Sequence, residues 1–154
     1  MAVVRQKTVV TYSFTAAATT HSRTDVNVRD VSSVIDEPVE RGGTNQGLSP
    51  TETLMAALLG CTNTIFHKCA DKHGVKLQKM SMRLEGRFDR RGVLLQEEVD
   101  VPFPAMTMFV DIVTDAPDAA VDAAKTDLHK FCPISKAIRA SGTDLQEVWA
   151  VTRP

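Results

Sequence analysis

The sequence predicts an α+β protein in which strands lie before and after one long helix. Segments that alternate apolar and polar residues, as strands do, occur in the first quarter and in the second half of the chain. Residues 50–73 carry the start and stop signals of a long helix. Because the strands are grouped instead of alternating with helices, a doubly wound parallel sheet is disfavoured.

Length and composition predict a single globular domain over residues 1–154. The chain has 154 residues, of which 43% are hydrophobic and 24% charged, and no repeat or linker divides it. A formal net charge of -1 argues against nucleic acid or an anionic membrane as partner. The apolar run 54–59 is too short to span a bilayer, and no secretory signal is visible. We therefore expect a cytoplasmic protein with no membrane contact.

The N-terminal third predicts two strands and a loop. Residues 3–15 are rich in Val, Thr, Tyr and Phe, which favour strands. Residues 25–35 alternate valine with polar residues, as expected for a second strand with one wet face. Residues 36–38 (Asp-Glu-Pro) and the Gly- and Asn-rich residues 42–47 then predict a loop.

The long helix has clear boundaries. Ser49 and Glu52 form an S-x-x-E capping box with Pro50 at the first helical position, and Gly74 suits the position just past the end. Up to His67 the helix has almost no polar face, so it should be buried on all sides. A chain of this size cannot easily bury such a helix alone. This pattern predicts a homodimer with helices packed across the interface.

Two strand-like segments follow the long helix, at residues 77–88 and 94–113. Residues 89–92 (Asp-Arg-Arg-Gly) predict a hairpin turn between them. Pro102 and Pro104 interrupt the second segment and indicate a bend or a bulge.

The C-terminal part of the chain predicts two helices and a closing strand. Residues 117–131 have a helical apolar stripe, and Cys132-Pro133 opens a short helix with proline at its first position. Residues 145–152 form the closing strand.

The three cysteines, Cys61, Cys69 and Cys132, indicate free thiols. Their odd number does not suggest a disulfide scaffold, and catalytic, redox or buried thiols are the alternatives. No C-x-x-C pair is present, and structural zinc sites use closely spaced ligand pairs, so we expect neither a metal nor a cofactor.

Cys132 has the sequence context of a reactive thiol. At the N-cap of the short helix, it would face free N–H groups and the positive helix end, which favour the thiolate. Lys130, Lys136 and His129 could add to this effect. The alternative is a cap residue that happens to be cysteine.

By themselves, Cys61 and Cys69 are predicted to be core cysteines, because free cysteine is among the most buried residue types. Glu52 has a ready structural role as the carboxylate of the capping box.

Residues 50–62 (PTETLMAALLGCT), preceded by the glycine loop 42–47, resemble the first-cysteine signature of the OsmC/Ohr family. These are the osmotically inducible protein C and organic hydroperoxide resistance proteins. The Asp-Glu-Pro at 36–38, the Glu-Gly…Asp at 85–89 and the Cys-Pro-Ile-Ser at 132–135 also match. The resemblance extends from about residue 3 to residue 152. Its two cysteine motifs, in the right order, make it specific.

The resemblance implies an OsmC-like fold, with antiparallel sheets packed around a long buried central helix in an intertwined homodimer. It also implies a thiol peroxidase that reduces organic hydroperoxides. In this family the first cysteine, here Cys61, attacks the peroxide and becomes a sulfenic acid. The second, here Cys132, condenses with it to a disulfide, which an external dithiol reopens.

The resemblance further implies that a glutamate and an arginine flank the reactive sulfur. Glu52 matches the glutamate, while Arg23 is the first choice for the arginine and Arg29 and Arg41 are alternatives. The Thr51-Glu52 placement resembles the broader OsmC-like group more than its hydroperoxide-resistance branch.

Helix geometry adds a constraint of its own. Glu52 and Cys61 are nine residues apart, which places them about 180° apart around an ideal helix. Either the helix bends between them or Glu52 serves the cysteine of a partner subunit.

Two other functions are compatible with the residues. One is a non-catalytic or small-molecule-binding member of the same fold that keeps Cys61 and Cys132 as buried thiols. The other is a cysteine hydrolase, for which only His129 is placed by sequence to act as the base.

Overall fold

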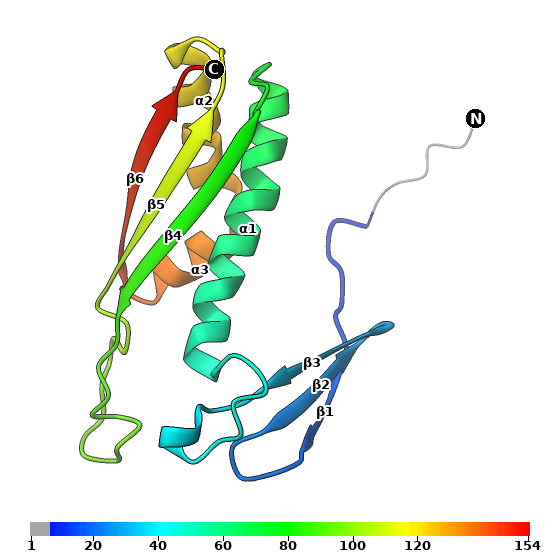
Figure 1. Ribbon diagram of the computed structural model, residues 1–154, viewed down its shortest axis with the longest axis vertical. Helices are drawn as coiled ribbons and strands as arrows, with labels where there is room; N and C mark the ends of the chain where they lie inside the picture. The colour runs from blue at the N-terminus through cyan, green and yellow to red at the C-terminus, as the bar shows by residue number, and fades with distance from the viewer. Residues whose placement is uncertain (1–6) are drawn as a thin grey trace. The chain divides into compact units, whose positions relative to one another are not determined.

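A computed structural model describes residues 7–154 (Figure 1). The chain forms two compact units, one up to Leu54 and one from Met55 to Pro154. The single domain over 1–154 stays a prediction. The elements are β1 (Phe14–Ala18), β2 (Thr24–Val28), β3 (Val31–Ile35), η1 (Val39–Arg41), α1 (Pro50–Lys72), β4 (Lys79–Arg87), β5 (Ala105–Val113), α2 (Asp118–Phe131), α3 (Pro133–Ala140) and β6 (Asp144–Thr152).

The first unit contains an antiparallel sheet in the order β1-β2-β3. The predicted strand 3–15 is wrong in its extent, because β1 starts only at Phe14; residues 3–6 lie outside the described part of the chain. The single strand expected over 25–35 is also wrong. The chain reverses at Arg29 and Asp30, where Arg29 adopts a left-handed φ of 54°. Asp30 is the only common turn residue at this reversal, so the signal in the sequence is weak.

The loop expected after β3 is confirmed, and the buried carboxylate of Asp36 organises it. Asp36 accepts hydrogen bonds from the backbone N–H groups of Glu37 (2.8 Å), Thr44 (3.0 Å) and Gln46 (3.1 Å). The Thr44 hydroxyl donates at 2.5 Å and is the main cause that lowers the pKa of Asp36 to about 2. At Gly43 a Cβ atom would lie 1.7 Å from the Glu37 carbonyl oxygen, so only glycine allows this close packing.

The second unit contains a mixed sheet in the order β4-β5-β6. β4 and β5 are antiparallel, as expected, but β5 and β6 are parallel, so the expectation of antiparallel sheets fails for this one pair. The physical reason is the connection: α2 and α3 lie between β5 and β6 and form the crossover that a parallel pair requires.

The chain turns at residues 90–95, close to the hairpin turn predicted at 89–92, but the strand expected from residue 94 is wrong in its extent. Residues 88–104 form a long connection without a strand, and β5 begins directly after Pro104. Proline cannot donate to the ladder, so Pro102 and Pro104 delay the strand instead of bending it.

The core of the second unit lies on one face of its sheet. Alternate residues of β5 (Met106, Met108, Val110 and Ile112) are fully buried and belong to one apolar cluster with residues of the helices. The helices lie on one side of this sheet (Figure 1). From the helices, the buried residues are Leu58, Thr62, Phe66, Cys69 and Ala70 of α1, Val121, Ala124, Asp127 and Leu128 of α2, and Ser135 and Ile138 of α3.

The bounds of α1 confirm the predicted long helix, and Gly74 has the left-handed φ of 69° expected just past its end. In this single chain, however, α1 buries one stripe only, and Leu54, Ala57 and Gly60 are exposed. Burial on all sides would need a further surface, so the homodimer stays a prediction. Within residues 7–154, no helix is both long and apolar enough to cross a bilayer.

Candidate active site

The second unit brings together the two cysteines that the resemblance paired. The Cys132 Sγ lies 3.4 Å from the Cys61 Sγ. Cys61 comes from the middle of α1 and is partly buried, whereas Cys132 is fully buried at the junction of α2 and α3. Two thiols at this distance need only a small movement to form a disulfide, whose S–S bond is about 2.05 Å long.

Cys132 occupies a sharp junction between two helices. It is the only residue between Phe131, the end of α2, and Pro133, the start of α3, and it is the N-cap of α3 as predicted. Its backbone N–H donates to the Leu128 carbonyl at 2.9 Å, and its carbonyl accepts from the Lys136 N–H at 3.1 Å. The Cys132 side chain makes no capping hydrogen bond, so its sulfur is free to face Cys61.

The start of the short helix acts on Cys61. The backbone N–H of Ile134, at the second position of α3, hydrogen bonds to the Cys61 thiol. Burial raises the pKa of the Cys61 thiol above its ordinary value, the Ile134 hydrogen bond opposes this, and the neighbouring Cys132 raises it further. The groups around Cys61 in this unit therefore favour its neutral thiol form.

Glu52 forms the predicted capping box. The Ser49 backbone N–H donates to Glu52 Oε2 at 2.8 Å, and the Glu52 N–H donates to Ser49 Oγ at 3.3 Å. The Ser49 backbone hydrogen bond is the largest cause that lowers the pKa of Glu52, and the charge of Arg41 contributes as well. Glu52 is thus an ionised carboxylate in the first turn of α1.

The three candidate arginines have different partners in the first unit. Arg23 donates to Asp25 Oδ1 through Nε (3.1 Å) and Nη2 (2.9 Å). Arg41 pairs with Glu37 at 2.8 Å, and Arg29 lies 3.9 Å from Asp30 with a largely exposed side chain. Among the three, Arg41 is the one whose charge acts on Glu52.

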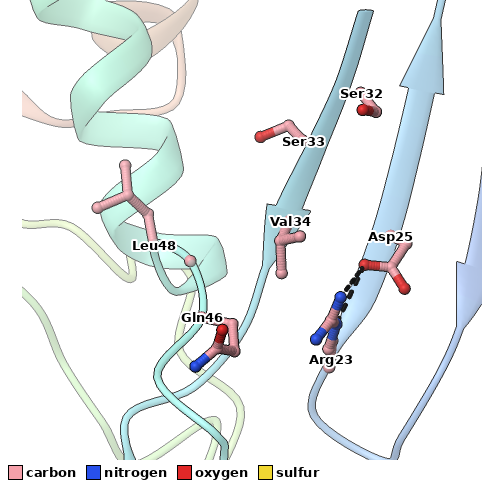
Figure 2. A pocket seen from close by; sticks show the side chains of 8 residues that line it. Arg23, Asp25, Ser32, Ser33, Val34, Gln46 and Leu48 are labelled. Atoms are coloured by element: carbon pink, nitrogen blue, oxygen red, sulfur yellow. Dashed lines mark hydrogen bonds and ion pairs between the residues drawn. The ribbon is translucent and has the colours of Figure 1, made fainter.

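Arg23 also lines a cavity of about 650 Å³ within the first unit. Figure 2 shows Arg23 and Asp25 side by side, joined by their hydrogen bonds, with Ser33, Gln46 and Leu48 around the same space. The cavity contains polar and apolar walls and no thiol.

The remaining candidates, Cys69 and His129, have surroundings of their own. Cys69 is buried in the core, as predicted. His129, the only base considered for a cysteine hydrolase, has its Nε2 atom 3.2 Å from Oε2 of Glu147. In the described part of the chain, no three His, Cys, Asp or Glu side chains gather as metal ligands would.

Sequence reasoning missed the Ile134 N–H and Glu147. The Cys-Pro pair at the start of a helix indicates backbone N–H groups without a partner inside the helix. Which atom accepts a hydrogen bond from them depends on how α1 and α3 pack. A lone glutamate in an alternating strand carries no signal of a buried network.

The fold and the thiol pair define an α+β dithiol protein, and comparison with known proteins gives its family. The model of the family described as "OsmC-like protein" matches residues 43–147. The chain belongs to the OsmC-like family.

Solved structures with the same fold support this. An OsmC-like protein from Mycoplasma pneumoniae is 15% identical with a TM-score of 0.77, covering 93% of this chain and 98% of its own. The organic hydroperoxide resistance protein OsmC from Legionella pneumophila is 19% identical (TM-score 0.63; 94% and 99% covered). OhrB, the organic hydroperoxide resistance protein of Bacillus subtilis, is 20% identical (TM-score 0.56; 92% and 98% covered). A search of the curated proteins finds no match to this chain.

Proposed function

We propose that this protein is a thiol-dependent peroxidase that reduces organic hydroperoxides and so defends against oxidative stress. The observation that carries the proposal is the 3.4 Å separation of the Cys61 and Cys132 sulfurs. The names of two structures with the same fold, both organic hydroperoxide resistance proteins, support the substrate class.

Exposure supports the order of the two thiols. Cys61 is partly exposed, whereas Cys132 is fully buried, so a peroxide from solvent reaches Cys61 first. The Cys61 thiolate attacks one peroxide oxygen, the O–O bond breaks, and an alcohol leaves after taking up a proton. Cys61 is then a sulfenic acid.

Cys132 resolves this intermediate. Its sulfur displaces the hydroxyl from the Cys61 sulfur, the S–O bond breaks, and water leaves with the Cys132 proton. An external dithiol then reduces the disulfide and restores both thiols. Three free cysteines are typical of a reducing compartment, so we place this cycle in the cytoplasm.

Activation of Cys61 requires a positive charge, because burial alone raises its pKa. We propose that an arginine supplies it and that Glu52 orients this arginine through an ion pair. Arg23 is the first choice from the resemblance, and the contribution of Arg41 to the low pKa of Glu52 supports Arg41 as the alternative. The exposed face of α1 supports an active homodimer.

Consumption of cumene hydroperoxide tests the proposal, with a lipoamide-type dithiol and a monothiol compared as reductants. Wild-type protein should turn over, and Cys61→Ser should abolish turnover without changing the fold. Cys132→Ser should still consume about one peroxide per chain and then stop, because only the resolving step is lost. Full activity of Cys61→Ser would refute the assignment, and prior oxidation of Cys132 would reverse the two roles.

A second candidate is a small-molecule-binding protein with unreactive thiols. The cavity beside Arg23 and Asp25, which contains no thiol, favours it. Thiol titration before and after one equivalent of cumene hydroperoxide distinguishes the two. A peroxidase loses its free thiols stoichiometrically, and a binding protein keeps them.

A further inference from the structure

Glu147 on β6 is a buried carboxylate that the proposed chemistry does not use. In the register of the sheet it lies opposite Met108, whose side chain is fully buried, and only 5% of the Glu147 side chain is exposed. Glutamate is almost never buried unless it is paired. Its partners therefore indicate why it is there.

Each oxygen of Glu147 binds a side chain from a different helix. Oε2 lies 3.2 Å from His129 Nε2 of α2, and Oε1 lies 3.3 Å from Arg139 Nη2 of α3. Arg139 also donates through Nη1 to the Leu145 carbonyl of β6 at 2.5 Å. Trp149 Nε1 completes the set with a hydrogen bond to Oε2 at 3.0 Å. We refer to Glu147, His129 and Arg139 as the Glu147 clamp.

Two members of the Glu147 clamp, His129 and Arg139, lie before and after Cys132 in the sequence. His129 lies in the last turn of α2 and Arg139 in the last turn of α3, and Cys132 is the only residue between the two helices. No capping hydrogen bond holds the Cys132 thiol. The position of its sulfur therefore depends on how the two helices are held against the sheet.

We propose that Glu147 is a positioning residue for Cys132, which keeps the Cys132 sulfur within reach of Cys61 and so speeds disulfide closure. This inference rests on the resolving step of the proposed function. In that step the S–S bond forms, the S–O bond of the Cys61 sulfenic acid breaks, and water leaves with the Cys132 proton. Glu147 itself exchanges no proton or electron.

Glu147→Gln tests the proposal because glutamine has the same size but only one acceptor oxygen. Its NH₂ group would face a donor of either His129 or Arg139, so one side of the clamp is released. Rapid mixing with cumene hydroperoxide, followed by acid quench and mass spectrometry, separates sulfenic acid formation from closure. Sulfenic acid should form within about twofold of the wild-type rate, while closure slows about tenfold or more, since small misplacements have effects of this size.

His129→Gln is a milder second variant, because the His129 side chain is half exposed and its loss leaves Arg139 on Glu147. Its closure rate should lie between those of the wild type and Glu147→Gln. Glu97→Gln is the matched control, since Glu97 is an exposed carboxylate paired with Arg91 in the loop 88–104. The control should close at the wild-type rate. Far-UV circular dichroism reports that each variant is folded, because Trp149 itself hydrogen bonds to Glu147 and its fluorescence would change with that substitution.

Wild-type closure rates in both Glu147→Gln and His129→Gln would overturn the proposal. If Glu147→Gln does not fold, His129→Gln alone decides. If the wild-type protein does not react with peroxide, the proposed function fails, and diamide separates the two failures. Diamide takes two electrons and two protons from a thiol pair, so it closes the disulfide without a sulfenic acid. Slower closure by diamide in both variants would support the clamp, and equal rates would reject it.

Discussion

The two compact units of this chain are organised by different forces. In residues 7–54 only Asp36 and Ser49 are buried, every residue of β1 is exposed, and the loop after β3 is held by hydrogen bonds to Asp36. In residues 55–154 the sheet and helices enclose an apolar core. Every buried hydrophobic residue of the described chain lies between Leu58 and Leu145.

This difference indicates what the first unit requires for stability and what the second requires for thiol chemistry. A hydrogen bond contributes only about 1 kcal/mol net, and a three-stranded sheet requires a covered apolar face to be stable. The first unit instead exposes Tyr12, Phe14 and Val31. The second unit is stable by packing, but burial raises the pKa of its Cys61 thiol. The polar unit lacks apolar cover, and in the apolar unit no cation is among the groups that shift the pKa of Cys61.

The largest expected effect concerns this missing cover. We expect an obligate homodimer whose unfolding midpoint rises with protein concentration, because the interface takes part in the stability of the fold. Phe14→Asp should shift the protein to monomer, whereas Phe131→Asp should not. The two phenylalanines have similar exposure, 61% and 58%, but lie in different units.

Sedimentation velocity at micromolar concentration measures this. A stable, folded 16.8 kDa monomer of the wild type would contradict the prediction. Dissociation by both substitutions would indicate that the cover is not specific to the first unit.

The next largest effect concerns the cation that the proposed activation of Cys61 requires. Glu52→Gln should melt close to the wild type, because the glutamine oxygen still accepts the Ser49 N–H. It should reduce organic hydroperoxide at least ~10-fold more slowly, about 1.4 kcal/mol of transition-state stabilisation, because it cannot hold an arginine by charge.

Glu40→Gln, a change at another exposed glutamate of the first unit, is the control for this substitution and should keep full activity. Equal activity of Glu52→Gln and the wild type would leave Glu52 as a helix cap only. It would also weaken the peroxidase proposal.

The parts of the fold that the sequence predicted have local signals. The capping box and Gly74 set the ends of α1, and Cys132-Pro133 set the start of α3. The missed parts depend on contacts distant in sequence or on weak turns. The reversal at Arg29 has Asp30 as its only common turn residue, which is a weak signal. The two crossover helices were predicted, but the strand beside which β6 lies, and hence its parallel pairing, depends on contacts distant in sequence.

The candidate site shows the same division. From the residues alone, Cys61 was a core cysteine; the resemblance paired it with Cys132, and the structure brings the two sulfurs together. The hydrogen bond from Ile134 to Cys61 could not be predicted, because it depends on how α1 and α3 pack. The same is true of the Glu147 clamp, whose members come from three elements.

A smaller effect, a loss of stability, should appear at acidic pH. Each unit contains one carboxylate, Asp36 or Asp127, that holds several partners by hydrogen bonds. Hydrogen bonds, from Thr44 to Asp36 and from Lys72 to Asp127, are the largest causes that lower both pKa values from 3.8 to about 2. A lowered pKa in the folded state contributes stability that is present above about pH 4 and lost as the pH falls toward 2. Both units should therefore loosen in this window.

Asp36→Asn should reduce hydrogen-exchange protection of the Thr44 and Gln46 amides already at neutral pH, without affecting the second unit. Asp127→Asn should loosen only the contact of α2 with Lys72 and His73 at the end of α1. Loss of protection in both units from either change would show that they unfold together. Equal acid stability of the variants and the wild type would exclude the two carboxylates as its cause.

The smallest effect is expected at Cys69, which distinguishes packing from chemistry within the apolar unit. Its side chain is 5% exposed, and burial raises its pKa, with the charge of Asp127 adding to the shift. Cys69→Ala should lower the free energy of unfolding by about 1 kcal/mol, as expected for the loss of one small buried group. Peroxide turnover should stay within about twofold of the wild type, since altered packing alone rarely removes a catalytic step.

Chemical denaturation and cumene hydroperoxide consumption measure the two quantities, with Cys61→Ala as the matched substitution on the same helix. A loss of turnover in Cys69→Ala comparable to that in Cys61→Ala would show that a third thiol takes part in the cycle.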